Sequence, residues 1–199
     1  MKYLGPFVLS RTALARQSSN GDSGWVDYGE SPMENPQFLE DMTAAGMPGD
    51  EHMALAKRAG SWRVEGRMWM EPGGEPMPMT ATARTEVILG GRYTVEEYKS
   101  DFMGQPFEGR LLQGYDNLTE QYWSVWTDNM STGAWMSYGK KTAEGRYEYE
   151  GTAKDIMTPE GRPTRMVITV ARDGGYTMEM FDSRPDGSEF RSMELNYRR

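Results

Sequence analysis

The sequence predicts an all-β protein, an antiparallel up-and-down barrel of roughly ten strands preceded by a short N-terminal helix. From residue 62 to the end, apolar and polar residues alternate with a period of two in short segments, which are separated by turns rich in Gly, Pro and Asp. No long segment of helical period separates these strands, so the crossover helices of a parallel sheet are not expected. Closure into a barrel removes exposed sheet edges and leaves room for a small ligand inside.

Residues 1–49 are predicted to form an extension, and residues 50–199 the barrel domain. The polar run over 17–24 is typical of a flexible segment. A short helix is predicted over 37–45, because Pro36 suits the start of a helix and Gly46 suits its end.

A second helical segment, over 51–59, is expected to lead directly into the first strand. Asp50 is a good N-cap, and Lys57 and Arg58 in the last turn complement the helix dipole. Gly60 lies where a left-handed C-terminal cap is wanted.

The strands are predicted from their alternation and from the turns between them. In the first strand, Trp62, Val64 and Met68 share one face. Gly90-Gly91 suits a two-residue hairpin turn because both residues can adopt positive φ. The predicted strands cover residues 62–70, 78–89, 93–100, 107–115, 121–127, 133–140, 145–153, 164–172, 175–183 and 189–198.

The composition excludes several classes of partner and chemistry. The formal net charge of -8 argues against nucleic acid or an anionic membrane as the main partner, since both require clustered Lys and Arg. No run approaches the ~20 apolar residues of a membrane-spanning helix, so no membrane span is expected. The sequence has no Cys, which excludes disulfides, thiolate catalysis and thiolate metal sites.

The N-terminus imitates a secretion signal without matching one well. Its apolar run ends in Ala13-Leu14-Ala15, but Pro6 and Arg11 interrupt it. We therefore expect a cytoplasmic location, with export through a weak signal as the alternative.

The part of the sequence from about Asp50 to the end resembles a known family. The matching residues are His52 and Leu55; Gly60-Ser61-Trp62; Leu89-Gly90-Gly91-Arg92-Tyr93; Gly104-Gln105-Pro106-Phe107-Glu108-Gly109; Gly114-Tyr115-Asp116; Trp126-Thr127-Asp128; and Met193-Glu194-Leu195-Asn196-Tyr197-Arg198. On these residues the chain resembles the largely bacterial family known as domain of unknown function 1579. The resemblance implies a calycin-like (lipocalin-like) barrel and implies no particular activity.

The two ends of this match also suggest how the barrel is closed. A Gly-x-Trp at the start of the first strand is typical of calycin barrels, in which a late Arg packs across the Trp through a cation–π contact. The resemblance therefore pairs Trp62 with Arg198, or with Arg199. A structural plug is favoured over a ligand floor because a Trp buries ~150–250 Å² and suits a closure.

Methionine is unusually frequent, with 17 residues. Three pairs spaced by two residues each point to one face of a strand: Met68 with Met70, Met77 with Met79, and Met178 with Met180. Thioethers could bind Cu(I), but such sites usually include His or Cys. Adaptable packing around a ligand pocket is the favoured interpretation, with Met68 in the pocket wall and no metal site.

His52 is the only histidine. It could serve as a haem ligand or a general base, because histidine titrates near neutral pH. Its position on a helix before the barrel favours a capping or surface role instead. We therefore expect no cofactor, and neither a Ser-His-Asp triad nor a catalytic metal is supported by the spacing.

Polar groups on the strands are the better candidates for ligand contacts. Arg84 and Glu86 share one face of the second strand, Tyr98 lies on the third, and Trp126 and Asp128 share a face of the fifth. If they point inward, a few polar groups among aromatic and Met side chains make a typical ligand pocket. If they point outward, they are ordinary solvated cross-strand neighbours. The family resemblance favours an inward position for Trp126 and Asp128.

Three functions remain open at this point. The first is a monomeric or homodimeric barrel that binds a small apolar or amphipathic molecule without covalent chemistry and has no catalytic residues. The second is an enzyme that uses Asp128 or Glu86 as a buried acid or base. The third is a protein-interaction module with a filled lumen, in which residues 1–49 dock a partner.

Overall fold

The computed structural model of the chain describes residues 26–29, 31–184 and 186–199. The secretion-like segment and the polar run over 17–24 lie outside these residues. The chain divides into two compact units. One contains the described residues up to Met47 together with Asn117–Thr119, and the other contains Pro48–Asp116 and Glu120–Arg199. No helix among the residues described is long and apolar enough to cross a bilayer.

The first unit contains a 3-10 turn, η1 (Pro32–Glu34), and a helix, α1 (Pro36–Gly46). Pro36 occupies the first helical position, and the Asn35 side chain accepts a hydrogen bond from the Gln37 backbone N–H at 2.9 Å. The helix predicted over 37–45 is therefore present, one residue longer at each end.

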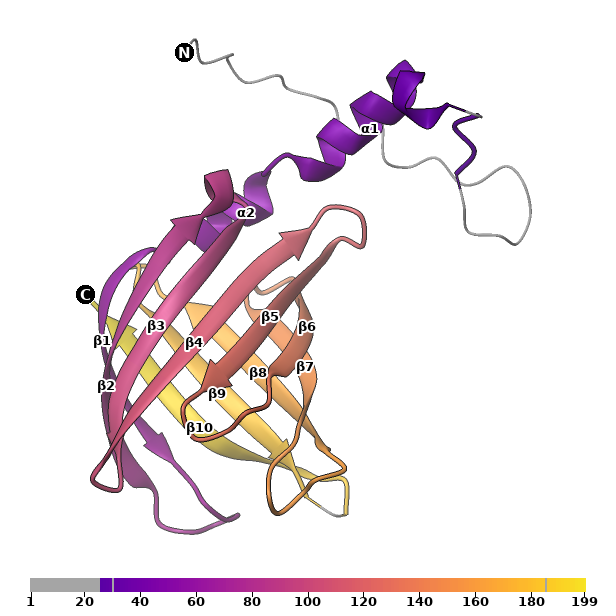
Figure 1. Cartoon of the computed structure of the whole chain (residues 1–199). Helices are drawn as coiled ribbons and strands as arrows, with labels where there is room; N and C mark the ends of the chain where they lie inside the picture. Colours follow the sequence, from indigo (N-terminus) through magenta and orange to yellow (C-terminus); the bar gives the residue numbers. More distant parts are fainter. Residues whose placement is uncertain (1–25, 30, 185) are drawn as a thin grey trace. The chain divides into compact units, whose positions relative to one another are not determined.

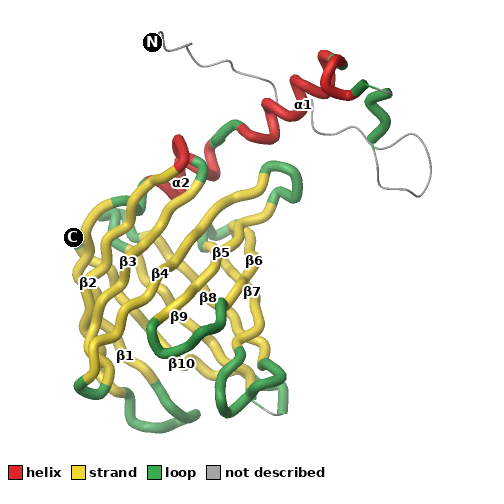
Figure 2. The backbone as a smooth tube through the Cα atoms, viewed as in Figure 1, coloured by secondary structure: helices red, strands yellow, loops and turns green. Residues whose placement is uncertain are grey.

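The second unit is a closed barrel in which every strand pairs antiparallel with its neighbours in sequence (Figures 1 and 2). The last strand pairs with the first and closes the sheet. This confirms the predicted fold class. The ten strands are β1 (Gly60–Met68), β2 (Met77–Ile88), β3 (Tyr93–Phe102), β4 (Gln105–Asp116), β5 (Gln121–Asp128), β6 (Trp135–Lys141), β7 (Tyr147–Ala153), β8 (Arg162–Val170), β9 (Tyr176–Ser183) and β10 (Glu189–Arg198), with the 3-10 turn η2 (Leu89–Gly91) between β2 and β3.

The helix before the barrel, α2 (Asp50–Ala56), is shorter than expected and is capped differently. Gly49, and not Asp50, is its N-cap, and the Gly49 backbone N–H donates to His52 Nδ1 at 3.0 Å. His52 thus has the predicted capping role, but it is buried. Burial lowers the pKa of His52, so the neutral ring that accepts this bond is favoured.

We call the end of the barrel that carries α2 and η2 the helix end, and the opposite end, where β1 runs into β2 and β3 into β4, the far end (Figure 1). Leu55 of α2 is buried in the same core as the inward residues of the strands. The core consists of Leu55, Trp62, Val64, Ala83, Tyr98, Leu111, Tyr122, Tyr147, Tyr149, Met166, Ile168, Tyr176, Met178, Leu195 and Tyr197.

Several aromatic rings lie flat against the inner wall because the wall residue beneath them is glycine. A Cβ on Gly109 would lie 2.2 Å from the Trp126 ring, and one on Gly139 would lie 2.8 Å from the Tyr149 ring. No other residue permits this approach without displacing the ring. The Trp126 and Tyr149 side chains therefore lie along the wall.

Candidate functional site

The two ends of the barrel differ in how far water reaches the inner face. Inward side chains near the helix end, such as Tyr147, Tyr176 and Tyr197, are buried. Inward side chains near the far end, such as Met79 and Met180, are only half-buried. Because these side chains face inward and still contact solvent, the inner wall is accessible from the far end.

A row of methionines runs along this part of the wall, and all its members except the last, Met166, are half-buried. Each member is the direct cross-strand partner of the next, and strand alternation places them on the inner face with Val64 and Ile168. Five adjacent strands thus contribute a flexible, apolar surface of the kind that accommodates ligands of varied shape. This methionine row consists of Met77, Met68, Met193, Met180 and Met166.

A second row on the inner face is small and polar. Its members are also direct cross-strand partners, from β3 to β8. Ser124 Oγ and Ser137 Oγ lie 2.7 Å apart and share a hydrogen bond. Gln113 Nε2 and Thr164 Oγ1 are buried and have no hydrogen-bond partner among the residues that the structure describes. This polar row consists of Thr94, Gln113, Ser124, Ser137, Gly151 and Thr164.

A buried carboxylate lies nearer the helix end. Glu96 accepts hydrogen bonds from the hydroxyls of Thr85 (2.9 Å), Tyr176 (3.1 Å) and Tyr197 (3.1 Å). The Tyr176 and Tyr197 rings stack with their centroids 4.1 Å apart. Burial raises the pKa of Glu96, while the three hydroxyls and the nearby Arg58 partly oppose this rise.

Arg58, which follows α2, extends into the same region. Its guanidinium carbon lies 5.7 Å from the Tyr147 ring centroid and 5.8 Å from that of Tyr176, which are cation–π distances. Its backbone oxygen accepts a hydrogen bond from Trp62 Nε1 at 3.0 Å. Its Nη2 is buried without a hydrogen-bond partner in the described part of the chain.

Of the predicted ligand residues, Tyr98, Trp126 and Met68 lie on the inner face. Tyr98 packs edge-to-face against Trp126 and Phe107. Burial raises its pKa to about 12, so the phenol stays protonated. Met68 belongs to the methionine row.

Asp128 lies beside Trp126 and holds it in place. One oxygen of Asp128 accepts from Trp126 Nε1 at 2.8 Å, and the other accepts from the backbone N–H groups of Met130 and Ser131. Both oxygens are thus used in the fold. In this arrangement Asp128 positions the indole and starts the turn after β5.

Arg84 and Glu86 lie on the outer face of β2, where they are exposed and form an ion pair of 2.7 Å. Alternation explains this, because Ala83 and Thr85 on the same strand are buried on the inner face. Neither residue lines the lumen, and the acid–base role considered for a buried Glu86 has no geometric basis.

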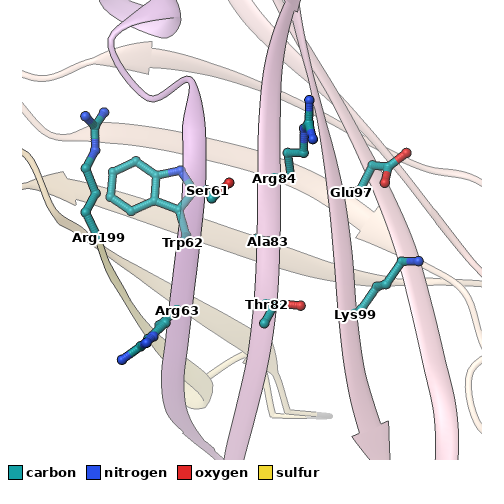
Figure 3. Close-up of a pocket in the computed structure, with 9 residues that line it drawn as sticks. All are labelled: Ser61, Trp62, Arg63, Thr82, Ala83, Arg84, Glu97, Lys99 and Arg199. Carbon is teal, nitrogen blue, oxygen red and sulfur yellow. The ribbon is translucent and has the colours of Figure 1, made fainter.

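The contact at the end of the chain involves Arg199 and not Arg198. The Arg199 side chain lies beside the Trp62 ring (Figure 3), with its guanidinium carbon 4.9 Å from the ring centroid. Its Nη2 donates to the backbone oxygens of Lys57 and Ala59. Tyr197 points inward, so Arg198 points outward and is exposed. The residue after it is the one that reaches Trp62.

The family described as "Protein of unknown function (DUF1579)" matches residues 47–199. The chain belongs to this family. No curated protein matches the chain.

This DUF1579 barrel also carries a groove of about 410 Å³ on its outer surface, beside Arg199 (Figure 3). Outward residues of β1, β2 and β3 form most of it. The groove therefore lies on the outside of the sheet and is separate from the lumen. The groove is lined by Ser61, Trp62, Arg63, Thr82, Ala83, Arg84, Glu97, Lys99 and Arg199.

The inward polar residues that the sequence left unassigned as site residues include Arg58, Gln113, Glu96 and Thr164. Gln113 and Thr164 each follow the alternation of inward and outward residues in their own strand, and this alternation is visible in the sequence. Their membership in one row depends on cross-strand register. Register joins residues far apart in the DUF1579 sequence and is not visible in any single strand.

Proposed function

We propose that this barrel binds a small, partly apolar molecule in its lumen, by non-covalent contacts, with entry at the far end. The observation that carries the proposal is the contrast along the inner wall. Half-buried methionines line the far end, and buried polar atoms without hydrogen-bond partners among the residues described lie on the same inner wall.

The unpartnered atoms support a ligand because they are costly. A buried donor or acceptor without a partner destabilises a protein by about 1–3 kcal/mol. Gln113 Nε2 and Thr164 Oγ1 both lie on the inner face and need a partner from outside the protein chain, either water or a ligand.

The wall chemistry supports an amphiphilic ligand over a purely polar one. The methionine row and the rings of Phe107 and Trp126 offer apolar contact near the far end. The polar row crosses the same wall from β3 to β8. A few polar groups within a largely apolar wall are typical of small-molecule sites.

The first experiment is native mass spectrometry of the protein purified gently from its own host, compared with the denatured mass. We expect a reproducible additional mass that is lost on denaturation. The mass of the released species would give the composition of the ligand. A bare chain from several independent preparations would contradict the occupied lumen.

The second experiment locates the site with neighbouring variants of opposite orientation. Ala81 faces inward on β2 and is half-buried, whereas Thr82 faces outward and lines the outer groove. Ala81→Phe fills the lumen, so binding of the uncharged dye Nile red should weaken by about tenfold or more. Thr82→Phe should leave it unchanged.

Circular dichroism and thermal melting show whether both variants retain the barrel. If Thr82→Phe abolishes dye binding and Ala81→Phe does not, the outer groove is the binding site and the lumen proposal is wrong.

A further inference from the structure

Several buried hydrogen-bond donors inside the barrel have no hydrogen-bond partner among the residues described. Three of them are considered together: Arg58 Nη2, Gln113 Nε2 and Tyr122 OH. Their residues are 5%, 5% and 2% exposed. We refer to these three side chains as the donor cluster.

The donor cluster gathers in one part of the lumen, near the helix end. The Tyr122 ring packs against Tyr147 with centroids 5.2 Å apart, and Arg58 lies over the same Tyr147 ring. Gln113 is the partner of Ser124, two residues along β5 from Tyr122 and on the same inner face. The three donors thus come from β4, β5 and the segment after α2.

No carboxylate within the described ranges forms an ion pair with Arg58, although its guanidinium is buried. Glu96 is the buried acid nearby, but its two oxygens already accept three hydroxyl hydrogen bonds. Glu96 thus interacts with Arg58 only beyond ion-pair distance. A buried guanidinium without an ion pair is costly, so an anionic acceptor from outside the chain would be favoured.

The methionine row leads from the far end to this cluster. Its last member, Met166, is paired with Tyr149, Tyr149 with Gly139, and Gly139 with Tyr122. One continuous row of cross-strand partners therefore joins the apolar wall of the far end to one of the three donors. The Tyr149 ring lies back over Gly139 and so follows the wall.

We propose that the donor cluster binds the carboxylate of a fatty-acid-like ligand whose apolar chain lies along the methionine row. This inference rests on the proposed function and adds the chemical class of the ligand and its orientation. The carboxylate lies at the helix end, bound by Arg58, Tyr122 and Gln113. The apolar chain points toward the far end.

The test compares two ligands with the same tail. Decanoate and decan-1-ol differ only in the head group, and their affinities for the full chain are measured by isothermal titration calorimetry at pH 8. We expect decanoate to bind at least about tenfold more tightly, because hydrogen bonds to a charged group are the strong ones. The alcohol should retain binding through its tail.

Variants of the donor cluster then assign the preference. Arg58→Met should bring the affinities for acid and alcohol to within about threefold of each other, and Arg84→Met, at the exposed outer face, is the matched control that should keep the preference. Tyr122→Phe and Gln113→Leu each remove one donor at nearly constant volume. They should each weaken decanoate by about threefold to tenfold and leave decan-1-ol unchanged, so the test does not depend on Arg58→Met folding.

The outcomes separate the two proposals. If neither ligand binds, lumen binding of this class of amphiphile fails. If both bind with equal affinity, lumen binding stands and the donor cluster is not a carboxylate site. A preference for decanoate that survives in Tyr122→Phe and Gln113→Leu but is lost in Arg84→Met would place the anion in the outer groove and overturn the inference.

Discussion

At the scale of single residues, Glu96 shows most clearly how the barrel interior changes side-chain chemistry. It is buried and accepts bonds from three hydroxyls, while its sequence neighbour Glu97 points outward and pairs with Arg110 at 2.9 Å. Strand alternation alone gives the two adjacent glutamates these opposite environments.

The raised pKa of Glu96 makes stability depend on pH. Between the ordinary value of 4.5 and the higher value in the folded state, the folded protein retains a proton that the unfolded chain has released. The free energy of unfolding should therefore fall as pH rises from about 4.5 toward the folded-state pKa, by up to about 1.4 kcal/mol per unit of pKa difference. Urea unfolding at a series of pH values measures this decrease in the free energy of unfolding.

Two glutamine variants isolate this effect. Glu96→Gln has no proton to release, so its stability relative to the natural protein should increase with pH over that interval. Glu97→Gln should track the natural protein at every pH, apart from a small constant offset from its exposed ion pair. Parallel pH profiles for the natural protein and Glu96→Gln would show that Glu96 titrates normally in the folded state.

At the scale of elements, the seven residues of α2 act mainly through what they bury. A helix of this length is not stable by itself, so packing must hold it in place. His52 packs edge-to-face against Tyr115 of β4 with ring centroids 5.7 Å apart, and Leu55 enters the core of the barrel. The segment that follows leads Arg58 inward and Trp62 into β1.

Leu55 should therefore carry much of the stability that α2 contributes. Leu55 is 1% exposed and Met53 on the same helix is 56% exposed. Leu55→Ala should lower the free energy of unfolding by about 2–5 kcal/mol. Met53→Ala should change it by less than about 0.5 kcal/mol, as measured by urea unfolding. Equal losses in the two variants would show that α2 is not docked through Leu55.

At the scale of the whole molecule, the barrel depends on pairing between the first and last strands. Arg63 of β1 is opposite Arg198 of β10, and a Cβ on Gly66 would lie 2.1 Å from the Glu194 backbone oxygen. Only glycine allows this approach. The closure thus joins segments from opposite ends of the domain, with no free sheet edge between them.

A chain that begins at Pro48 contains the whole of the second unit, together with the few residues Asn117–Thr119 that group with the first unit. We expect this shortened chain to show the circular dichroism of a β-protein and one cooperative thermal transition. A transition within about 3 °C of the full chain is expected, since the core residues all remain. A broad, non-cooperative transition would show that the first unit is needed for folding.

The sequence by itself determined the strands, their turns and the antiparallel barrel, because alternation and glycine turns are local patterns set by backbone geometry. It also placed Trp62, Val64 and Met68 on one face. Only the tertiary structure decided that Arg84 and Glu86 point outward, that Arg199 closes on Trp62, and that Arg58, Gln113 and Tyr122 share one part of the lumen. These facts depend on register and closure, which join residues far apart in the chain and leave no periodic signal in any one segment.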